Sequence, residues 1–215
     1  MLKAEQIDKL FRLLNKSIET PVTALNYGSE FQLLIAVMLS AQATDVSVNQ
    51  VTPGLFAIAP SPEKMLELAR AGFEQLVRRI GLYKTKSANI LNTCKALIEC
   101  HNSRVPDTRE ALEKLPGVGR KTAGVVLNVA FGKPEIPVDT HVFRVANRMG
   151  LAAAKTPLET EQQLMTVVPD WIKLKAHHLL ILHGRHVCKA RKPLCSGCPV
   201  IMICQFQEKN LEQPH

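Results

Sequence analysis

Hydrophobic positions repeat with the period of an α-helix along almost the whole chain. Ile7, Leu10, Phe11 and Leu14 follow the i, i+3, i+4, i+7 spacing of one helix face, and the stretch from Phe73 to Ile80 repeats that spacing. The sequence lacks the alternation of polar and apolar residues that is typical of a half-buried strand. We therefore expect an all-α protein.

Start and stop residues define further helices. Ser29 precedes the stretch Glu30–Ser40, which is apolar on nearly all sides and predicts a buried central helix. The pair Ser61-Pro62 opens another helix, with serine at the cap and proline in the first turn. The pair Pro53-Gly54 is expected to break or end the helix that begins after Asp45. The same period predicts helices near residues 86–101, 120–131, 140–149, 158–167 and 171–182.

The composition favours a globular protein that binds a polyanion. A chain of 215 residues can bury the core of one large domain or two small ones. It carries 27 Lys and Arg against 19 Asp and Glu, a formal net charge of +8, although a merely basic soluble protein would have the same charge. Aromatic residues make up only 5%, which disfavours an RNA-binding sheet built on stacking side chains. Four basic residues in a stretch without acidic ones are candidate phosphate contacts: Arg185, Lys189, Arg191 and Lys192.

The sequence predicts neither a secretory signal nor a membrane span. The first residues are charged and lack the apolar core of a signal peptide. Apolar runs such as Phe31–Leu39 are too short to cross a bilayer. We expect a soluble cytoplasmic protein with no membrane partner, in which cysteines are ligands or buried thiols rather than disulfides.

The run Leu-Pro-Gly-Val-Gly-Arg-Lys-Thr-Ala over residues 115–123 predicts a tight turn between two helices. Thr108 is expected to cap a short helix ending near Leu115, and Gly119 to let the chain turn with no Cβ in the way. Backbone amides at this turn would face solvent at the positive end of a helix dipole, which suits a phosphate oxygen. An ordinary helix-turn-helix corner is the alternative. Four residues form this candidate DNA contact: Gly117, Val118, Gly119 and Arg120.

Six cysteines fall into two sets. Cys188, Cys195, Cys198 and Cys204 form a C-x6-C-x2-C-x5-C array, and four thiolates that close in sequence can surround one metal centre. The spacing leaves open a tetrahedral zinc site or a four-iron cluster, although a zinc ribbon more often has two C-x-x-C pairs. We expect His183 and His186 to be non-ligand histidines near phosphate. Cys94 and Cys100, on a predicted helix, are expected to be small core residues.

Five motifs in this order resemble the endonuclease III family, bifunctional DNA glycosylases of the helix-hairpin-helix superfamily. They are the run Leu-Ser-Ala-Gln-Ala-Thr-Asp at 39–45, Gly-Leu-Tyr at 81–83, the hairpin at 115–123, Val-Asp-Thr-His at 138–141, and the cysteine array. The resemblance covers nearly the whole chain. It implies two helical lobes flanking a DNA-binding cleft: a six-helix lobe over residues 22–133 that contains the hairpin, and a second lobe from residues 1–21 and 134–215. It also implies one [4Fe-4S] cluster held by the four C-terminal cysteines.

The same resemblance implies roles for two residues in catalysis. Lys121 matches the lysine that attacks the sugar, forming a Schiff base at C1′ followed by β-elimination of the 3′ phosphate. The dipole of the following helix and the neighbouring Arg120 disfavour the ammonium, as a nucleophilic amine requires. A surface lysine that binds phosphate is the alternative. Asp139 precedes a predicted helix, where it can cap the helix and also stabilise positive charge developing on the sugar. His141 is a secondary, DNA-contacting position.

Base excision also requires that the damaged base leave the stack. Gln42 and Leu82 match the family's positions that fill the resulting gap, although a loop glutamine and a core leucine would have the same appearance. The resemblance implies a base-excision-repair enzyme that removes oxidised pyrimidines such as thymine glycol from double-stranded DNA and cleaves abasic sites. We expect a monomer in the cytoplasm of a bacterial-type cell, associated with the nucleoid. An adenine-mismatch glycosylase, a non-catalytic helix-hairpin-helix module and a zinc protein are the alternatives.

Overall fold

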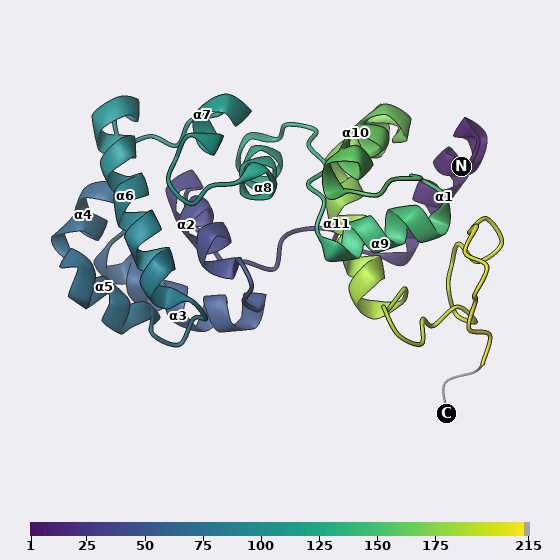
Figure 1. Cartoon of the computed structure of the whole chain (residues 1–215), viewed down its shortest axis with the longest axis horizontal. Helices are drawn as coiled ribbons and strands as arrows, with labels where there is room; N and C mark the ends of the chain where they lie inside the picture. Colours follow the sequence, from purple (N-terminus) through teal and green to yellow (C-terminus); the bar gives the residue numbers. More distant parts are fainter. Residues whose placement is uncertain (213–215) are drawn as a thin grey trace. The chain divides into compact units, whose positions relative to one another are not determined.

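The computed structural model describes residues 1–212, and within that range every regular element is an α-helix (Figure 1). The prediction of an all-α protein is therefore confirmed. The chain divides into two compact units, which we treat separately. The central unit is residues 24–132, and the terminal unit combines residues 1–23 with residues 133–212. The last three residues of the predicted second lobe, 213–215, lie outside the described residues.

The central unit is built around one buried helix. α2 contacts α3, α6 and α8, and every residue from Leu33 to Leu39 is buried. The predicted buried central helix is thus confirmed, and Ser29 caps it by accepting a hydrogen bond from the Gln32 amide. The seven helices of this unit are α2 (Glu30–Ser40), α3 (Asp45–Ile58), α4 (Pro62–Glu67), α5 (Ala69–Val77), α6 (Tyr83–His101), α7 (Arg109–Glu113) and α8 (Arg120–Phe131). Only Leu68 separates α4 from α5.

The expectation that Pro53 and Gly54 interrupt their helix is wrong. α3 continues through both residues to Ile58. A proline inside a helix costs about 3 kcal/mol, through a lost hydrogen bond and a clash with the carbonyl four residues earlier. Just beyond them, Leu55 and Phe56 are buried in the core, and burial of each contributes about 1.5–3 kcal/mol. Tertiary packing therefore outweighs the local penalty.

The terminal unit has four helices and a long C-terminal loop. α9 (Thr140–Met149) packs on α11 (Asp170–His186) and on α10 (Pro157–Val167), and α1 (Ala4–Ser17) packs on α11. The four residues whose spacing predicted the first helix are all buried in this core. Residues 187–212 contain no helix. No helix in the described part of the chain is both long and apolar enough to span a membrane.

The two cysteines of α6 differ from expectation. Cys94 is fully buried, and burial raises the pKa of its thiol to about 12. Cys100 is exposed, so its prediction as a core residue is wrong. At 3.6 residues per turn, two positions six residues apart point roughly 120° apart around a helix. Only one of them can face the core.

Candidate DNA-binding and catalytic site

The run at residues 115–123 forms a compact turn between α7 and α8. Thr108 caps α7 by accepting from the Ala111 amide, as predicted. The amides of Leu115 and Val118 then donate to the carbonyls of Leu112 and Leu115, each at 3.0 Å. The side chain of Val118 is buried. Val118 therefore packs the turn onto the core, and its own amide is used within the turn.

The two glycines of this turn have different requirements. Gly117 has a φ of +77°, and a Cβ there would lie 2.7 Å from the Cβ of Asn89. Gly119 has an extended conformation with a φ of −93°, and a Cβ there would meet no atom within 4 Å. The expectation that Gly119 supplies the freedom to turn is wrong, because Gly117 does so. The protein's own packing leaves the space beside Gly119 open.

Lys121 lies in the first turn of α8, which begins directly after Gly119. Gly117, Gly119, Arg120 and Lys121 are all exposed. The N-terminus of a twelve-residue helix carries partial positive charge from its aligned peptide dipoles. This end of the helix therefore combines an exposed amine with a surface that favours anions.

α6 supports the hairpin through residues that the sequence reasoning missed. The Thr93 hydroxyl donates to the carbonyl of Pro116 at 2.8 Å. Asn89, one turn earlier, packs against Gly117. The spacing of Asn89 and Thr93 puts both on one face of α6, and this much can be read from the sequence. The sequence does not show that this face contacts the hairpin.

Gln42 and Leu82 share a pocket in the central unit. Gln42 follows the C-terminus of α2 with a φ of 55°, and Leu82 caps α6 with a φ of 59°, a conformation that is costly for residues other than glycine. Both residues are exposed, and Leu82 is 61% exposed. The core-leucine alternative is therefore excluded. The pocket is lined by Met38, Ala41, Gln42, Leu82, Thr85, Lys86, Asn89 and Gly117.

Asp139 caps α9 in the terminal unit. Its Oδ1 accepts hydrogen bonds from the amides of His141 and Val142, each at 2.8 Å. These two bonds fix the orientation of the Asp139 side chain. His141 is half-buried, and its Nδ1 lies 3.3 Å from the guanidinium of Arg144.

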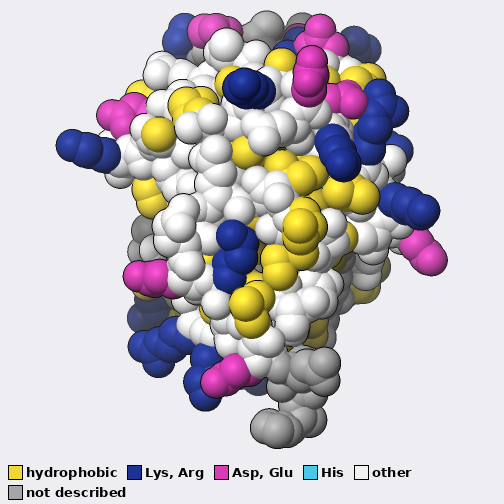
Figure 2. Space-filling view, turned by 90° about the vertical axis from the view of Figure 1, so that its right-hand side faces the viewer, with side chains coloured by type: hydrophobic (Ala, Val, Ile, Leu, Met, Phe, Trp, Pro, Cys, Tyr) yellow, Lys and Arg dark blue, Asp and Glu magenta, His cyan; other side chains and the backbone are white. Residues whose placement is uncertain are grey.

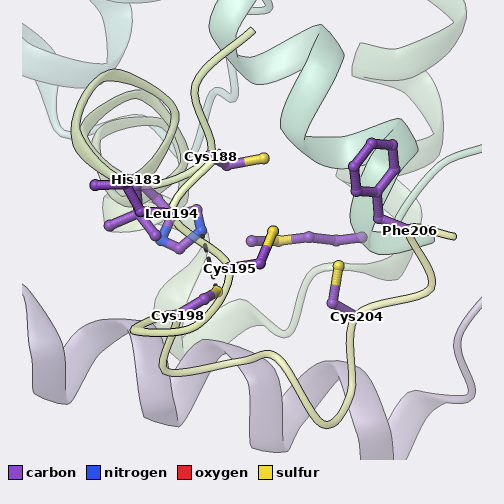
Figure 3. Close-up of a pocket in the computed structure, with 9 residues that line it drawn as sticks. His183, Cys188, Leu194, Cys195, Cys198, Cys204 and Phe206 are labelled. Carbon is purple, nitrogen blue, oxygen red and sulfur yellow. Dashed lines mark hydrogen bonds between the residues drawn. The ribbon is translucent and has the colours of Figure 1, made fainter. Parts of the chain in front are cut away.

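The four C-terminal cysteines line one pocket, together with His183, Leu194 and Phe206 (Figure 3). Burial raises the pKa of Cys198 to about 11 and that of Cys204 above its ordinary value. A thiolate in this pocket therefore needs a compensating cation. Among residues 1–212, no three His, Cys, Asp or Glu side chains stand close enough together to hold a single ion.

His183 belongs to this pocket rather than to a phosphate-facing surface. The residue is 2% exposed, and burial lowers its pKa to about 4. Its Nε2 lies 3.7 Å from the Cys198 sulfur. The expectation that His183 lies near phosphate is therefore wrong. His186, at the end of the same helix, is exposed.

The predicted basic residues are presented around the cysteine loop. Arg185 on α11 and Lys189, Arg191 and Lys192 in the loop are all exposed. Arg148 holds the backbone there by donating to the carbonyls of Lys189 at 2.7 Å and Ala190 at 3.0 Å. Figure 2 shows basic and acidic side chains interspersed, with hydrophobic ones between them, on the face that it draws. The net positive charge is therefore not gathered into one patch on that face.

Comparison with known proteins places these features in a family. Residues 35–170 match the model of the HhH-GPD superfamily base excision DNA repair protein. Endonuclease III from Escherichia coli K12 is 52% identical over 209 residues, covering 97% of this chain and 99% of that one, and the Haemophilus influenzae protein is 51% identical over the same coverage. The chain belongs to the endonuclease III family.

Solved structures of the family agree with this assignment. The trapped covalent intermediate of endonuclease III with DNA matches with a TM-score of 0.90 and 43% identity, over 95% of this chain and 97% of that one. A non-covalent endonuclease III–DNA complex has the same TM-score and identity. A thermostable thymine-DNA glycosylase shares the fold at a TM-score of 0.83 and 23% identity. As an endonuclease III family member, the chain is a DNA-binding base-excision-repair enzyme, a DNA glycosylase with abasic-site lyase activity.

Proposed function

We propose that Lys121 is the nucleophile of this enzyme and that Asp139 is its catalytic carboxylate. The observation that carries the proposal is the exposed lysine in the first turn of α8, directly after the hairpin turn. Its position matches the lysine of the endonuclease III motif. One related structure is that of a trapped covalent intermediate between endonuclease III and DNA, which agrees with a mechanism in which the enzyme bonds to its substrate.

In the proposed reaction, the neutral Nζ of Lys121 forms a bond to C1′ of the damaged nucleotide. The bond between C1′ and the base breaks, and the base leaves with its electron pair and takes up a proton. Opening of the sugar ring gives a protonated Schiff base at C1′. Loss of a C2′ proton then breaks the C3′–O bond and expels the 3′ phosphate. Water hydrolyses the imine and regenerates the amine.

Asp139 supplies negative charge where positive charge develops on the sugar, and helps to activate the amine. Two amide hydrogen bonds to Oδ1 support this role, because they orient the carboxylate before substrate binds. Preorganised charge is effective because no reorganisation is needed in the transition state.

The hairpin and two exposed side chains are proposed to hold the DNA. The space beside Gly119 lets a phosphate oxygen approach the backbone at the N-terminus of α8. Gln42 and Leu82 would enter the gap left by the extruded base. His141 and the basic residues Arg185, Lys189, Arg191 and Lys192 are proposed as further contacts, chiefly to phosphate.

The cysteine loop is proposed to hold one [4Fe-4S] cluster through Cys188, Cys195, Cys198 and Cys204. Support comes from the four thiols, which line one pocket, and from their spacing along the chain, which matches the cysteine array of the family. When bound, the cluster supplies a cross-link that folds the loop and presents its basic residues.

Oxidised pyrimidines such as thymine glycol are the proposed substrates. A pyrimidine that has lost its aromaticity stacks poorly, so extruding it costs less than extruding an intact base. Abasic sites bypass base release and enter at the lyase step.

The test is borohydride trapping on a thymine glycol duplex with Lys121→Ala and the control Lys95→Ala, which alters an exposed lysine on α6. We expect Lys121→Ala to bind the duplex but to lose base release and the trapped adduct. The control should keep both activities. A covalent adduct formed by Lys121→Ala at the native rate would assign the nucleophile to another amine.

A further inference from the structure

One buried amine in the central unit has no role in the proposed chemistry. Lys86, on α6, is only 8% exposed. Its Nζ donates a hydrogen bond to the carbonyl of Leu39 at 2.8 Å. Burial lowers the pKa of Lys86 below its ordinary value. A buried ammonium that faces a carbonyl instead of a carboxylate is costly, so core stability alone would favour an apolar side chain here.

Lys86 hydrogen-bonds to two backbone carbonyls, one in each of the segments that carry the two exposed residues proposed to fill the gap. Leu39 is in the last turn of α2, and the chain reaches Gln42 three residues later. The backbone amide of Lys86 donates to the carbonyl of Leu82 at 3.0 Å, closing the first turn of α6. One residue is thus hydrogen-bonded to both segments that carry Gln42 and Leu82.

Both segments have backbone conformations that need support. Gln42 and Leu82 have positive φ angles of 55° and 59°, which side-chain-bearing residues adopt only when their surroundings fix them. Lys86 also lines the same pocket as these two residues. The α2 carbonyl that it engages is near the negative end of the helix dipole, where a cation is favourable.

We propose that Lys86 is a positioning residue that holds the α2 C-terminus against the start of α6. Gln42 and Leu82 can then enter together the gap left in the duplex by a missing or extruded base. This inference depends on the proposed DNA contacts of Gln42 and Leu82. It assigns Lys86 no contact with the substrate. Replacing Lys86 should therefore weaken binding to a duplex that lacks a base and should leave binding to intact DNA unchanged.

The test compares Lys86→Met, which keeps the apolar stem and removes the charge, with Lys95→Met as a matched control on the exposed side of α6. The full protein is titrated with a duplex containing a tetrahydrofuran abasic analogue opposite 2-aminopurine, and with an undamaged duplex. We expect Lys86→Met to bind the abasic duplex about tenfold more weakly, the scale of one lost hydrogen bond to a charged group. The 2-aminopurine fluorescence change should also shrink. Binding to undamaged DNA, and both signals in Lys95→Met, should match the wild type.

Folding is checked by thermal melting of the same samples. We expect the midpoint of Lys86→Met to be equal to or above that of the wild type, because a buried charge has been removed. Lys86→Arg, which retains a donor, should recover part of the fluorescence change. A double-mutant cycle with Gln42→Ala should be less than additive, since both changes would disable one unit.

Equal fluorescence changes in Lys86→Met and wild type would overturn the inference, as would an equal loss on undamaged DNA. If Gln42→Ala and Leu82→Ala reduce the signal while Lys86→Met does not, the inference fails and the proposed DNA contacts stand. If Gln42→Ala and Leu82→Ala have no effect either, the proposed contacts fail and the inference fails with them. The borohydride test of Lys121 as the nucleophile does not depend on any of these outcomes.

Discussion

The two glycines of the hairpin should separate folding from DNA binding when each is changed to alanine. Gly117 has a positive φ, and an added Cβ would lie 2.7 Å from Asn89 Cβ. A left-handed conformation costs a non-glycine residue about 1–2 kcal/mol, and overpacking adds about 1–3 kcal/mol. The free energy of unfolding of Gly117→Ala should therefore fall by roughly 2–5 kcal/mol. At roughly 2–4 °C per kcal/mol for a chain of this size, the melting midpoint should fall by roughly 4–20 °C.

Gly119→Ala should behave in the opposite way. Its backbone is extended, and a Cβ meets no protein atom within 4 Å. Alanine is a poorer helix cap than glycine, but it restricts the unfolded chain by about 0.4–1 kcal/mol, so the two effects nearly cancel. The added methyl group would block a phosphate oxygen from the turn. Loss of a hydrogen bond to a charged group costs about 1.5–3 kcal/mol, which weakens DNA binding roughly 10- to 150-fold.

The assay pairs thermal melting with fluorescence anisotropy on an undamaged duplex at fixed salt concentration. An undamaged duplex is sufficient because contacts to phosphate carry no base identity. If Gly119→Ala binds as tightly as the wild type, the hairpin does not hold phosphate through its backbone. If Gly117→Ala melts at the wild-type temperature, the strain assigned to that position is absent.

The structure makes four further predictions. Asp139→Asn should reduce turnover on the order of 10²-fold in single-turnover assays, whereas its unfolding free energy should stay within about 0.5 kcal/mol because the side-chain oxygen still caps α9. Cys195→Ser should lose the brown absorption of an iron–sulfur cluster and weaken DNA binding; full iron content would refute the ligand assignment. Iodoacetamide should modify Cys100 in the folded protein and spare Cys94, whose pKa burial raises to about 12, as read by peptide mass spectrometry. Lys189→Ala should lower the slope of log affinity against log salt by about one unit, and an unchanged slope would place DNA elsewhere.

Local signals in the sequence predicted most of the helices. Capping residues and apolar period depend on a few neighbours, so α8 and α9 begin and end where the pattern indicates. The prediction at Pro53 is wrong because the penalty of a proline is local, while the compensating burial of Leu55 and Phe56 comes from residues distant in sequence. The prediction at Gly119 is wrong for a related reason. A Gly-x-Gly pattern does not reveal which glycine has the positive φ.

The residues of the candidate site also differ in how far the sequence predicts them. Lys121, Asp139 and the cysteine array are carried by contiguous motifs that a resemblance can match. Lys86 and Thr93 act through carbonyls of Leu39 and Pro116, at sequence separations of 47 and 23 residues. Such contacts have no signature in sequence, because any carbonyl accepts a hydrogen bond. Only the packing of α6 against its neighbours selects these two.

The central unit thus combines a rigid core with two exposed residues, Gln42 and Leu82, whose backbone is strained. α2 is buried along nearly its whole length, so its C-terminal carbonyls have little freedom to move. Gln42 and Leu82 extend from that core with positive φ angles and exposed side chains. A DNA-binding side chain that must enter a narrow gap gains from such rigidity, because little conformational freedom remains to be lost on binding. The buried charge of Lys86 and the strain at these two positions are local costs that a unit with so extensive a core can sustain.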